Sequence, residues 1–312
     1  MMDKKVLVTG GAGFIGSNLV KRLLEDGNHV VVIDNLLRGN KIQKDVLKQI
    51  EFVNGDVRDK DLIIKITKNC DLIYHFAAVL GVDVVADNPV ETMDVETIGM
   101  RNITHAAIEH GIDKILYAST SGIYGRSVME SAVTEEVIVD PKTSYAIAKR
   151  YNEIYLAAMF EEKGIHSVSL RFFNVYGHNQ DNRMVIPRFF EQATKNEPIT
   201  VFGNGKQTRD FTYIDDTIEA CIRLSEVVKG AEIVNIANEK EGCIEELAHV
   251  IKKITNSQSE IKYIDAPKKR YDYEVERRVG NSSKLFGLTN YKPHTTLEEG
   301  LNTIYQSKLY EI

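Results

Sequence analysis

The sequence predicts an α/β fold, a Rossmann-type doubly wound parallel sheet with a smaller, discontinuous C-terminal substrate lobe. Three observations support this prediction. Short apolar runs alternate with amphipathic runs of helical spacing through residues 5–172, a glycine-rich turn follows the first apolar run, and the second apolar run ends in an acid. Strands that alternate with helices of this length indicate a parallel sheet covered on both faces.

The first element is a strand that breaks into a glycine turn and then a helix. Val6, Leu7 and Val8 are followed by a turn that reads G-x-G-x-x-G from Gly11 or G-x-x-G-x-x-G from Gly10. Glycines let the backbone turn sharply and approach a pyrophosphate, and the helix N-terminus offers N–H groups to anionic oxygens. The sequence therefore predicts a dinucleotide site at this turn.

The second strand indicates which dinucleotide binds. Residues 29–33 are apolar after His29 and end at Asp34, where a carboxylate can accept hydrogen bonds from the adenosine ribose. The same carboxylate would repel a 2′-phosphate, which favours NAD over NADP. Arg38, four residues later, could meet a phosphate, but it lies in a polar loop where arginines are commonly solvated.

The alternation continues with clear helix boundaries. Pro89 is typical of a helix start, and Gly111 and Gly164 are typical of helix ends. The next expected strands are 51–53, 71–76, 114–118 and 167–172. The helices expected between them are 61–68, 89–110 and 143–163.

From Tyr176 the alternation is interrupted by a polar loop, after which a helix at 215–228 and a strand at 233–236 indicate a return to the sheet. We therefore expect two discontinuous domains. They are 1–175 plus 210–237 for the cofactor and 176–209 plus 238–312 for the substrate.

Composition excludes several classes of partner. Lys+Arg number 39 against 45 Asp+Glu, for a net charge of −6, and no basic run stands out, so neither nucleic acid nor an anionic membrane is expected. No apolar run approaches the ~18 residues of a membrane span. Cys70, Cys221 and Cys243 are far apart, and the histidines show no ligand spacing. We expect reduced thiols, no metal, and a cytoplasmic location.

The expected reacting groups follow the fifth strand and begin the long helix. Residues 119–125, STSGIYG, carry hydroxyls at a strand end, and Tyr145 and Lys149 share one helix face. Lowering a phenol pKa from ~10 by about three units needs ~4 kcal/mol. An ammonium ~5 Å away supplies roughly 3 kcal/mol at an effective dielectric near 20. This spacing is generic alone, but its order after a nucleotide turn favours a catalytic base.

Together these motifs resemble the extended short-chain dehydrogenase/reductases, and more narrowly the NAD-dependent epimerase/dehydratase family that acts on nucleotide sugars. The motifs that carry the resemblance are the glycine turn, Asp56-Val57, His75-Phe76-Ala77-Ala78, residues 119–125, Tyr145 with Lys149, residues 171–177 and residues 203–216.

The resemblance implies roles for individual residues. Tyr145 would be the base, Lys149 would hold the nicotinamide ribose and tune the base, and Thr120, four residues before Tyr124, would bridge the sugar hydroxyl to Tyr145. The expected NAD-binding residues are Gly10, Gly13, Phe14, Ile15, Gly16, Asp34, Asn35, Asp56, Val57, Phe76, Ala77, Ala78, Tyr145 and Lys149. The expected residues for the nucleotide-diphosphate sugar are Thr120, Ser121, Tyr145, Asn174, Arg209 and Arg270.

The residues after Thr120 bear on the reaction. Relatives that eliminate water carry Asp-Glu there and those that decarboxylate commonly carry Glu, whereas this chain has Ser121 and Gly122. Without that carboxyl group we favour a 4-epimerase, with a UDP-sugar as the expected substrate and a transient 4-keto intermediate. Glu135, Glu136 or another acid from a loop could fill the gap, so a 4,6-dehydratase or a decarboxylase is the alternative. A non-catalytic NAD-sensing protein is the alternative of another class.

The sequence departs from the family pattern at two positions. Glu96 lies where many relatives have Asn, and Arg278 falls where epimerases place the residue that limits the sugar's N-acetyl group. An arginine there could favour a small or acidic sugar, or point elsewhere.

The helix at 143–163 is apolar on more than one face, and relatives pair it with 90–110 in a four-helix bundle. We therefore expect a homodimer.

Overall fold

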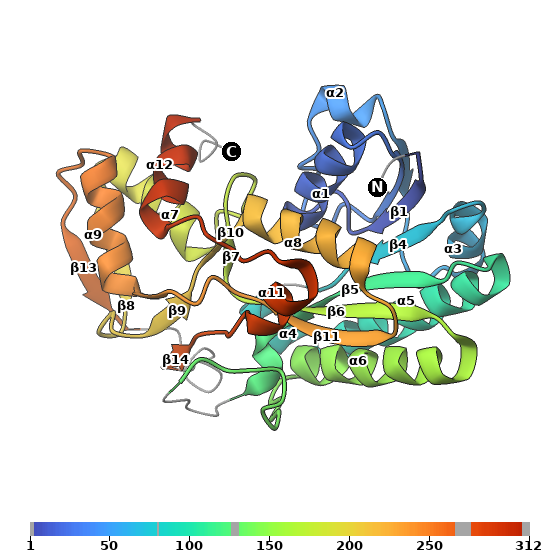
Figure 1. Ribbon diagram of the computed structural model, residues 1–312. Coiled ribbons are helices and arrows are strands. Elements are labelled where there is room, and N and C mark those ends of the chain that lie inside the picture. The colour runs from blue at the N-terminus through green and yellow to red at the C-terminus, as the bar shows by residue number, and fades with distance from the viewer. Residues whose placement is uncertain (1–2, 80, 126–130, 266–275, 308–312) are drawn as a thin grey trace.

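The computed structural model describes residues 3–79, 81–125, 131–265 and 276–307, and its centre is a seven-stranded sheet (Figure 1). The strand order is β11-β6-β5-β4-β1-β2-β3, and every neighbouring pair is parallel. The predicted Rossmann-type sheet is thereby confirmed. Its strands are β1 (Lys5–Thr9), β2 (His29–Asp34), β3 (Glu51–Asn54), β4 (Leu72–His75), β5 (Lys114–Thr120), β6 (His166–Phe172) and β11 (Ala231–Ile236).

Helices cover both faces of this sheet because its strands are apolar on both sides. Val6 and Val8 of β1 lie in the core beneath α1 (Phe14–Glu25) and α8 (Ile214–Val227). Leu7, which points the other way, lies in a second core. That core also holds side chains of α3 (Lys60–Thr67), α5 (Pro89–His110) and α6 (Ser144–Lys163). The alternation of one strand therefore feeds two separate layers.

The two long helices begin and end at residues whose local chemistry requires it. Pro89 stands in the first turn of α5, and Gly111 ends that helix with φ +68°. Thr143 caps α6 by accepting a hydrogen bond from the Ala146 N–H at 3.1 Å, so the helix begins at Ser144, and Gly164 ends it with φ +73°. Glycine tolerates this left-handed conformation, which explains why both signals predicted the ends correctly.

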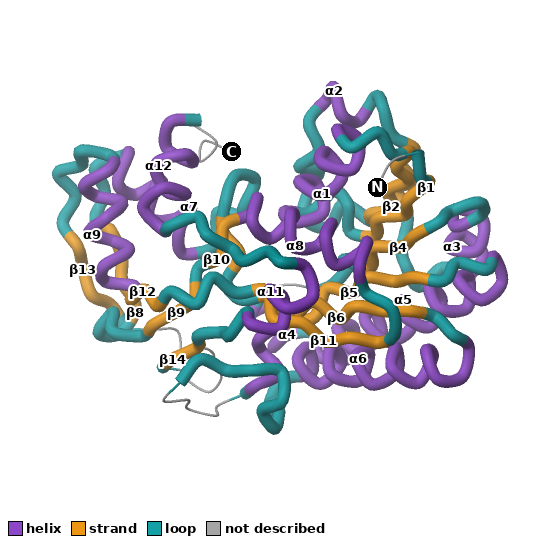
Figure 2. Tube along the Cα trace, viewed as in Figure 1, coloured by secondary structure: helices purple, strands orange, loops and turns teal. Residues whose placement is uncertain are grey.

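Smaller elements lie beyond the sheet on the left of Figure 1, and Figure 2 shows helices and short strands mixed there. The short pairings are β7 (Val175–Tyr176) with β10 (Thr212–Tyr213), β8 (Ile199–Phe202) with β13 (Ile261–Ile264), and β9 (Thr208–Asp210) with both β12 (Glu241–Cys243) and β14 (Arg277–Arg278). The accompanying helices are α7 (Val185–Thr194), α9 (Ile244–Ile254) and α12 (Leu297–Gln306). The remaining short helices are α2 (Lys44–Leu47), α4 (Val82–Asp87), η1 (Ser121–Tyr124) and α11 (Ser283–Thr289). The division into 1–175 plus 210–237 and 176–209 plus 238–312 stays a prediction.

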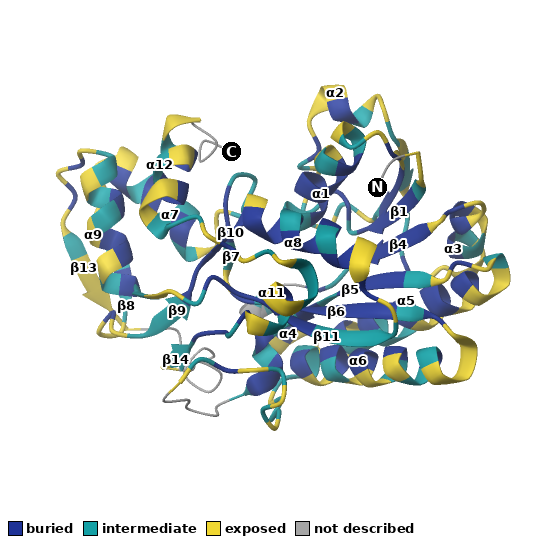
Figure 3. Cartoon of the chain, viewed as in Figure 1, coloured by how far each residue is buried: buried dark blue, intermediate teal, exposed yellow. Residues whose placement is uncertain are grey.

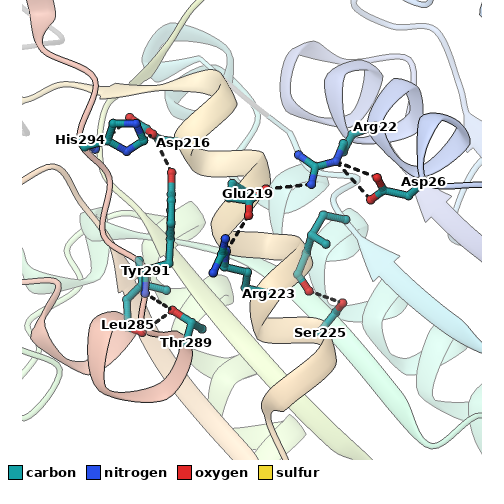
Figure 4. A network of polar contacts seen from close by, with 11 residues as sticks. Arg22, Asp26, Asp216, Glu219, Arg223, Ser225, Leu285, Thr289, Tyr291 and His294 are labelled. Carbon is teal, nitrogen blue, oxygen red and sulfur yellow. Dashed lines mark hydrogen bonds and ion pairs between the residues drawn. The ribbon is translucent and has the colours of Figure 1, made fainter. Parts of the chain in front are cut away.

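Helix α8 fixes distant parts of the chain to one another through polar contacts (Figure 4). Glu219 accepts a hydrogen bond from Arg223 at 2.6 Å and pairs with Arg22 of α1 at 2.8 Å. Asp216 accepts hydrogen bonds from the Tyr291 hydroxyl at 2.6 Å and from the Thr295 N–H at 2.9 Å. The C-terminal segment is thus tied to a helix that also packs on the sheet.

Burial follows this layered plan (Figure 3). The inner strands of the large sheet are mostly buried, the edge strands β3 and β11 are partly exposed, and the outer faces of the helices are exposed. Within the described residues, no helix combines the length and the apolar character that crossing a bilayer would require.

Candidate active site

Two positions of the glycine turn, Gly10 and Gly16, leave no room for a side chain. Gly10 has φ +68°, and a Cβ on it would lie 2.6 Å from the Ala77 nitrogen. A Cβ on Gly16 would lie 2.2 Å from the Gly10 oxygen. Gly13 precedes α1 and brings no side chain to cap it, so the first N–H groups of this helix can bind an anion. This narrow cradle fits the pyrophosphate of a dinucleotide.

Asp34 lies at the end of β2 and joins the strand to the turn. Its carboxylate accepts hydrogen bonds from the Ala12 N–H at 3.0 Å and the Leu36 N–H at 2.8 Å. Burial raises the pKa of Asp34, against the effect of these two bonds. A carboxylate has about four acceptor positions, so this one retains capacity for ribose hydroxyls. Arg38 faces Asp181, with Nη1 3.7 Å from Oδ2.

The other predicted cofactor residues lie along the same edge of the sheet. Asp56 follows β3, accepts hydrogen bonds from Arg58 at 2.9 and 2.7 Å, and also bonds to Asn35; the Arg58 guanidinium lowers its pKa. Ala77 follows β4 and donates its N–H to the Thr9 hydroxyl at 3.1 Å. The remaining residues, Val57, Phe76 and Ala78, accompany these strand ends, and Val57 and Phe76 are buried. Carboxyl ends of parallel strands meet at one edge, which is where ligands bind in such sheets.

The three predicted catalytic residues come together. Thr120 ends β5, Tyr145 lies in the first turn of α6, and Lys149 lies one turn further. The Tyr145 phenol and the Thr120 hydroxyl form a hydrogen bond. Lys149 Nζ is 5.4 Å from the centre of the Tyr145 ring. The Lys149 ammonium therefore lies beside the ring of Tyr145.

Two features of the site act against that ammonium: the phenol is desolvated, and a carboxylate lies next to Lys149. Glu96 of α5 lies 3.0 Å from Lys149, and both side chains are buried. The pKa of Tyr145 is raised above its usual value, first by burial and then by Glu96, while the bond to Thr120 acts in the opposite sense. Burial and Glu96 thus oppose the lowering of the phenol pKa to which Lys149 is expected to contribute.

The sequence did not predict a buried hydrogen-bond network that connects α6 to β5 and β6 next to these residues. Glu153 accepts hydrogen bonds from Ser119 at 2.6 Å and from Arg171 at 2.9 Å twice, while Asn152 donates to the Tyr117 hydroxyl at 2.9 Å. The signal was present as a polar stripe at helical spacing on α6, namely Tyr145, Lys149, Asn152 and Glu153. A buried helix face that is polar at successive turns indicates a network.

The predicted substrate residues are positioned less completely. Ser121 is buried beside Thr120, and Asn174 is exposed, with its carbonyl accepting a hydrogen bond from the Thr212 N–H at 3.1 Å. Arg209 donates to the Thr208 carbonyl at 2.7 Å. Arg270 lies outside the described residues.

Arg278 joins Arg209 at this end of the molecule. The two residues are register partners on β14 and β9, so their side chains share a face of the small sheet. Arg278 Nη2 also donates to the carbonyl of Gly125, at the end of the loop that begins at Thr120, over 3.4 Å. Burial and the nearby Arg209 lower the pKa of Arg278 to about 10. Two guanidinium groups side by side favour an anionic ligand.

The fold and these residues define a dinucleotide-binding enzyme of the short-chain dehydrogenase/reductase class. The sequence model of the NAD dependent epimerase/dehydratase family matches residues 6–237, and the chain belongs to this family. Its members are NAD-dependent enzymes, and the glycine cradle and Asp34 fit NAD as the cofactor.

Two relatives match the chain along almost its whole length. The chain is similar to a UDP-N-acetyl-alpha-D-glucosaminuronate decarboxylase of Bacillus cytotoxicus, with 33% identity over 98% of each chain. It is also similar to a putative UDP-glucose 4-epimerase of Methanocaldococcus jannaschii, with 36% identity over 96% of each chain. The family is thus clear, while the relatives differ in the reaction they are named for.

Solved structures of similar proteins agree with the fold and the cofactor. One is the UDP-glucose 4-epimerase of Thermotoga maritima with UDP-glucose, which has a TM-score of 0.91 and 30% identity, over 98% of this chain and 99% of that one. Another is the UDP-glucuronic acid 4-epimerase of Bacillus cereus in complex with UDP-glucuronic acid and NAD. It has a TM-score of 0.87 and 29% identity, over 97% of this chain and 98% of that one.

Proposed function

We propose that the protein is an NAD-dependent UDP-sugar 4-epimerase that works through a transient 4-keto sugar. The observation that carries the proposal is the hydrogen-bonded pair of Thr120 and Tyr145 beside Lys149, followed by Ser121 and Gly122 instead of a carboxylate. NAD, when bound, supplies a hydride acceptor that can return the hydride. Tyr145 takes the proton of the sugar 4-hydroxyl and gives it back, and Thr120 orients that hydroxyl through its bond to the phenol.

One of the acids considered for elimination, Glu135, is engaged elsewhere, which supports this choice. Glu135 accepts a hydrogen bond from the Asn235 N–H at 2.7 Å, and its carbonyl accepts one from Arg171. Glu136 is exposed. Dehydration needs an acid and a base beside the sugar in addition to Tyr145, and the carboxylate of Glu135 is bound to the Asn235 N–H instead.

The names of the relatives and the arginine pair support a UDP-sugar substrate. Arg209 and Arg278 provide two forked cations, which suits a diphosphate together with a second anionic group such as a uronate. For this reason decarboxylation of a UDP-uronic acid is the second candidate function, and the similarity to the Bacillus cytotoxicus decarboxylase favours it as well.

Product analysis tests these candidates directly. The protein is incubated with NAD and, separately, with UDP-glucose, UDP-N-acetylglucosamine and UDP-glucuronic acid, and the sugar is followed by proton NMR. We expect inversion at C4 with at least one of them. A UDP-pentose with release of CO₂ would support the decarboxylase and a 4-keto-6-deoxy sugar a dehydratase. No turnover of any sugar would favour a non-catalytic, NAD-sensing role.

The proposed assembly is a homodimer formed through α5 and α6. Ile147, Tyr151 and Ile154 lie at successive turns of α6 and are 46%, 43% and 56% exposed. Ile108 of α5 is 48% exposed. Apolar side chains repeated along one face of two adjacent helices suit a second copy of the same surface.

A further inference from the structure

Glu96 places a carboxylate next to the lysine of the proposed active site. Its Oε2 lies 3.0 Å from Lys149 Nζ and accepts a hydrogen bond from the Tyr117 hydroxyl at 3.1 Å. Its Oε1 is buried without a hydrogen-bond partner among the described residues. Removing two charges from water costs about as much as their attraction returns, so a buried ion pair is weak support for a purely stabilising role.

The neighbours from β4 and β5 do not add charge to this pair. His75 of β4 is kept neutral, because burial and then the charge of Lys149 lower its pKa to about 3. Tyr117 of β5 lies with its ring centre 4.7 Å from Lys149 Nζ, and burial raises its pKa well above the usual value. Both groups therefore remain uncharged at neutral pH.

The neighbours from α6 also add no unpaired charge next to Lys149 and Glu96. Asn152 is uncharged and donates its amide to the Glu96 carbonyl at 3.1 Å. Glu153 is negative, but Arg171 pairs with it at 2.9 Å. Lys149 and Glu96 are consequently the charges beside Tyr145 that matter most.

The pair has no net charge wherever its proton resides. A lone ammonium would favour the phenolate. A carboxylate 3.0 Å from that ammonium cancels most of this effect. The raised pKa of Tyr145, to which Glu96 contributes, agrees with this geometry.

We propose that Glu96 is a positioning residue for the reaction: by binding the Lys149 ammonium in the protein without cofactor, it neutralises the charge beside Tyr145 and keeps that phenol protonated. This rests on the proposed function in one respect only, namely that Tyr145 is the base. As a consequence, a residue of a second helix, α5, controls the protonation of the base on α6.

Tyrosine titration of the full chain without added dinucleotide tests the proposal. The ultraviolet absorbance of tyrosinate is followed against pH for each protein and for its Tyr145→Phe counterpart, and the difference isolates Tyr145. In the wild type we expect no step below about pH 10. In Glu96→Gln, which keeps the shape and removes the charge, we expect the midpoint to fall by ~1 pH unit or more below the wild-type value.

Three further proteins control this measurement. Glu96→Asp keeps the charge and should titrate like the wild type. Glu219→Gln removes a carboxylate that pairs with two arginines on the opposite side of the sheet, and should also leave the step where it is. Should Glu96→Gln fail to fold, Glu96→Asn, which also removes the charge, takes its place, and the midpoint should again fall by ~1 pH unit or more.

Two results would overturn the proposal: a Tyr145 step below about pH 9 in the wild type, or an unshifted step in a folded Glu96→Gln protein. Where a sugar is turned over, the acidic limb of the rate profile should move to lower pH in Glu96→Gln, because a more acidic phenol is deprotonated at lower pH. A merely structural role would lower the rate without moving that limb. If no sugar reacts, the proposed function fails, yet the titration still decides the role of Glu96.

Discussion

A phenol that must accept and return a proton is the group on which the proposed reaction depends most directly. Replacing Tyr145 with Phe removes that proton and the bond to Thr120 and leaves the ring in place. We expect kcat to fall ~10²–10⁴-fold, as for the loss of a general base. Steady-state assays with the reacting UDP-sugar measure the effect, and circular dichroism confirms the fold. Tyr151→Phe, which alters an exposed tyrosine of the same helix, is the control. Full activity in Tyr145→Phe would contradict the assignment.

Arg278 is the residue that should discriminate between sugars. Replacing it with Ser removes a cation that faces Arg209, so binding of a UDP-uronic acid should weaken more than binding of UDP-glucose. A hydrogen bond to a charged group is worth about 1.5–3 kcal/mol, so we expect KM for UDP-glucuronic acid to rise roughly 10–100-fold. Arg277→Ser is the matched control, because Arg277 pairs instead with Glu241 at 2.9 Å. Equal losses for both sugars in Arg278→Ser would refute a role in selectivity.

At this scale the sequence predicted which polar residues lie together at the candidate site, but not how their charges influence one another. Thr120, Tyr145 and Lys149 were identified from spacing and from a resemblance, and they do lie together. The charge state was not predictable, because Glu96 reaches Lys149 from a helix about fifty positions earlier in the chain. Spacing within one helix reveals contacts along that helix, whereas a buried charge acts across elements.

Among the elements, the glycine turn leaves no room for a side chain at Gly10 or Gly16. Gly16→Ala should destabilise the protein by about 1–3 kcal/mol or more and abolish NAD binding, because the new Cβ would lie 2.2 Å from the Gly10 oxygen. Thermal unfolding and calorimetric titration with NAD measure both effects. Gly287→Ala, at a helical glycine of α11 with open space around it, should instead leave binding intact and raise stability by up to ~1 kcal/mol. Tight NAD binding by Gly16→Ala would be incompatible with the cradle.

Long elements were predicted more accurately than short ones, for physical reasons. Helices α5 and α6 carry their own start and end signals, so their bounds were predicted to within one residue. The two-residue strands β7, β10 and β14 were not predicted, because so short a segment has no periodicity. Their pairing depends on neighbours distant in sequence, such as Arg278 of β14 with Arg209 of β9.

At the scale of the whole molecule, the exposed face of α6 should hold two copies together. Ile154→Glu places a charge in the centre of that face, where its desolvation on association would be costly, so we expect a monomer. Light scattering after size-exclusion chromatography at micromolar concentration measures the mass. Val227→Glu, at a residue of α8 that is 46% exposed, should leave the dimer unchanged. A monomeric wild type would refute the proposed assembly.

The pairing of β11 with β6 determines which fragments of the chain can fold. Residues 231–236 complete the sheet only after the chain has passed through the smaller elements beyond it. A fragment that stops after Tyr176 would retain the glycine turn. Without β11, however, β6 would become an open edge strand that can pair with another molecule. Such a truncation should collect in the insoluble fraction on expression. Engineering a minimal nucleotide-binding unit therefore calls for rejoining the ends of the chain rather than shortening it.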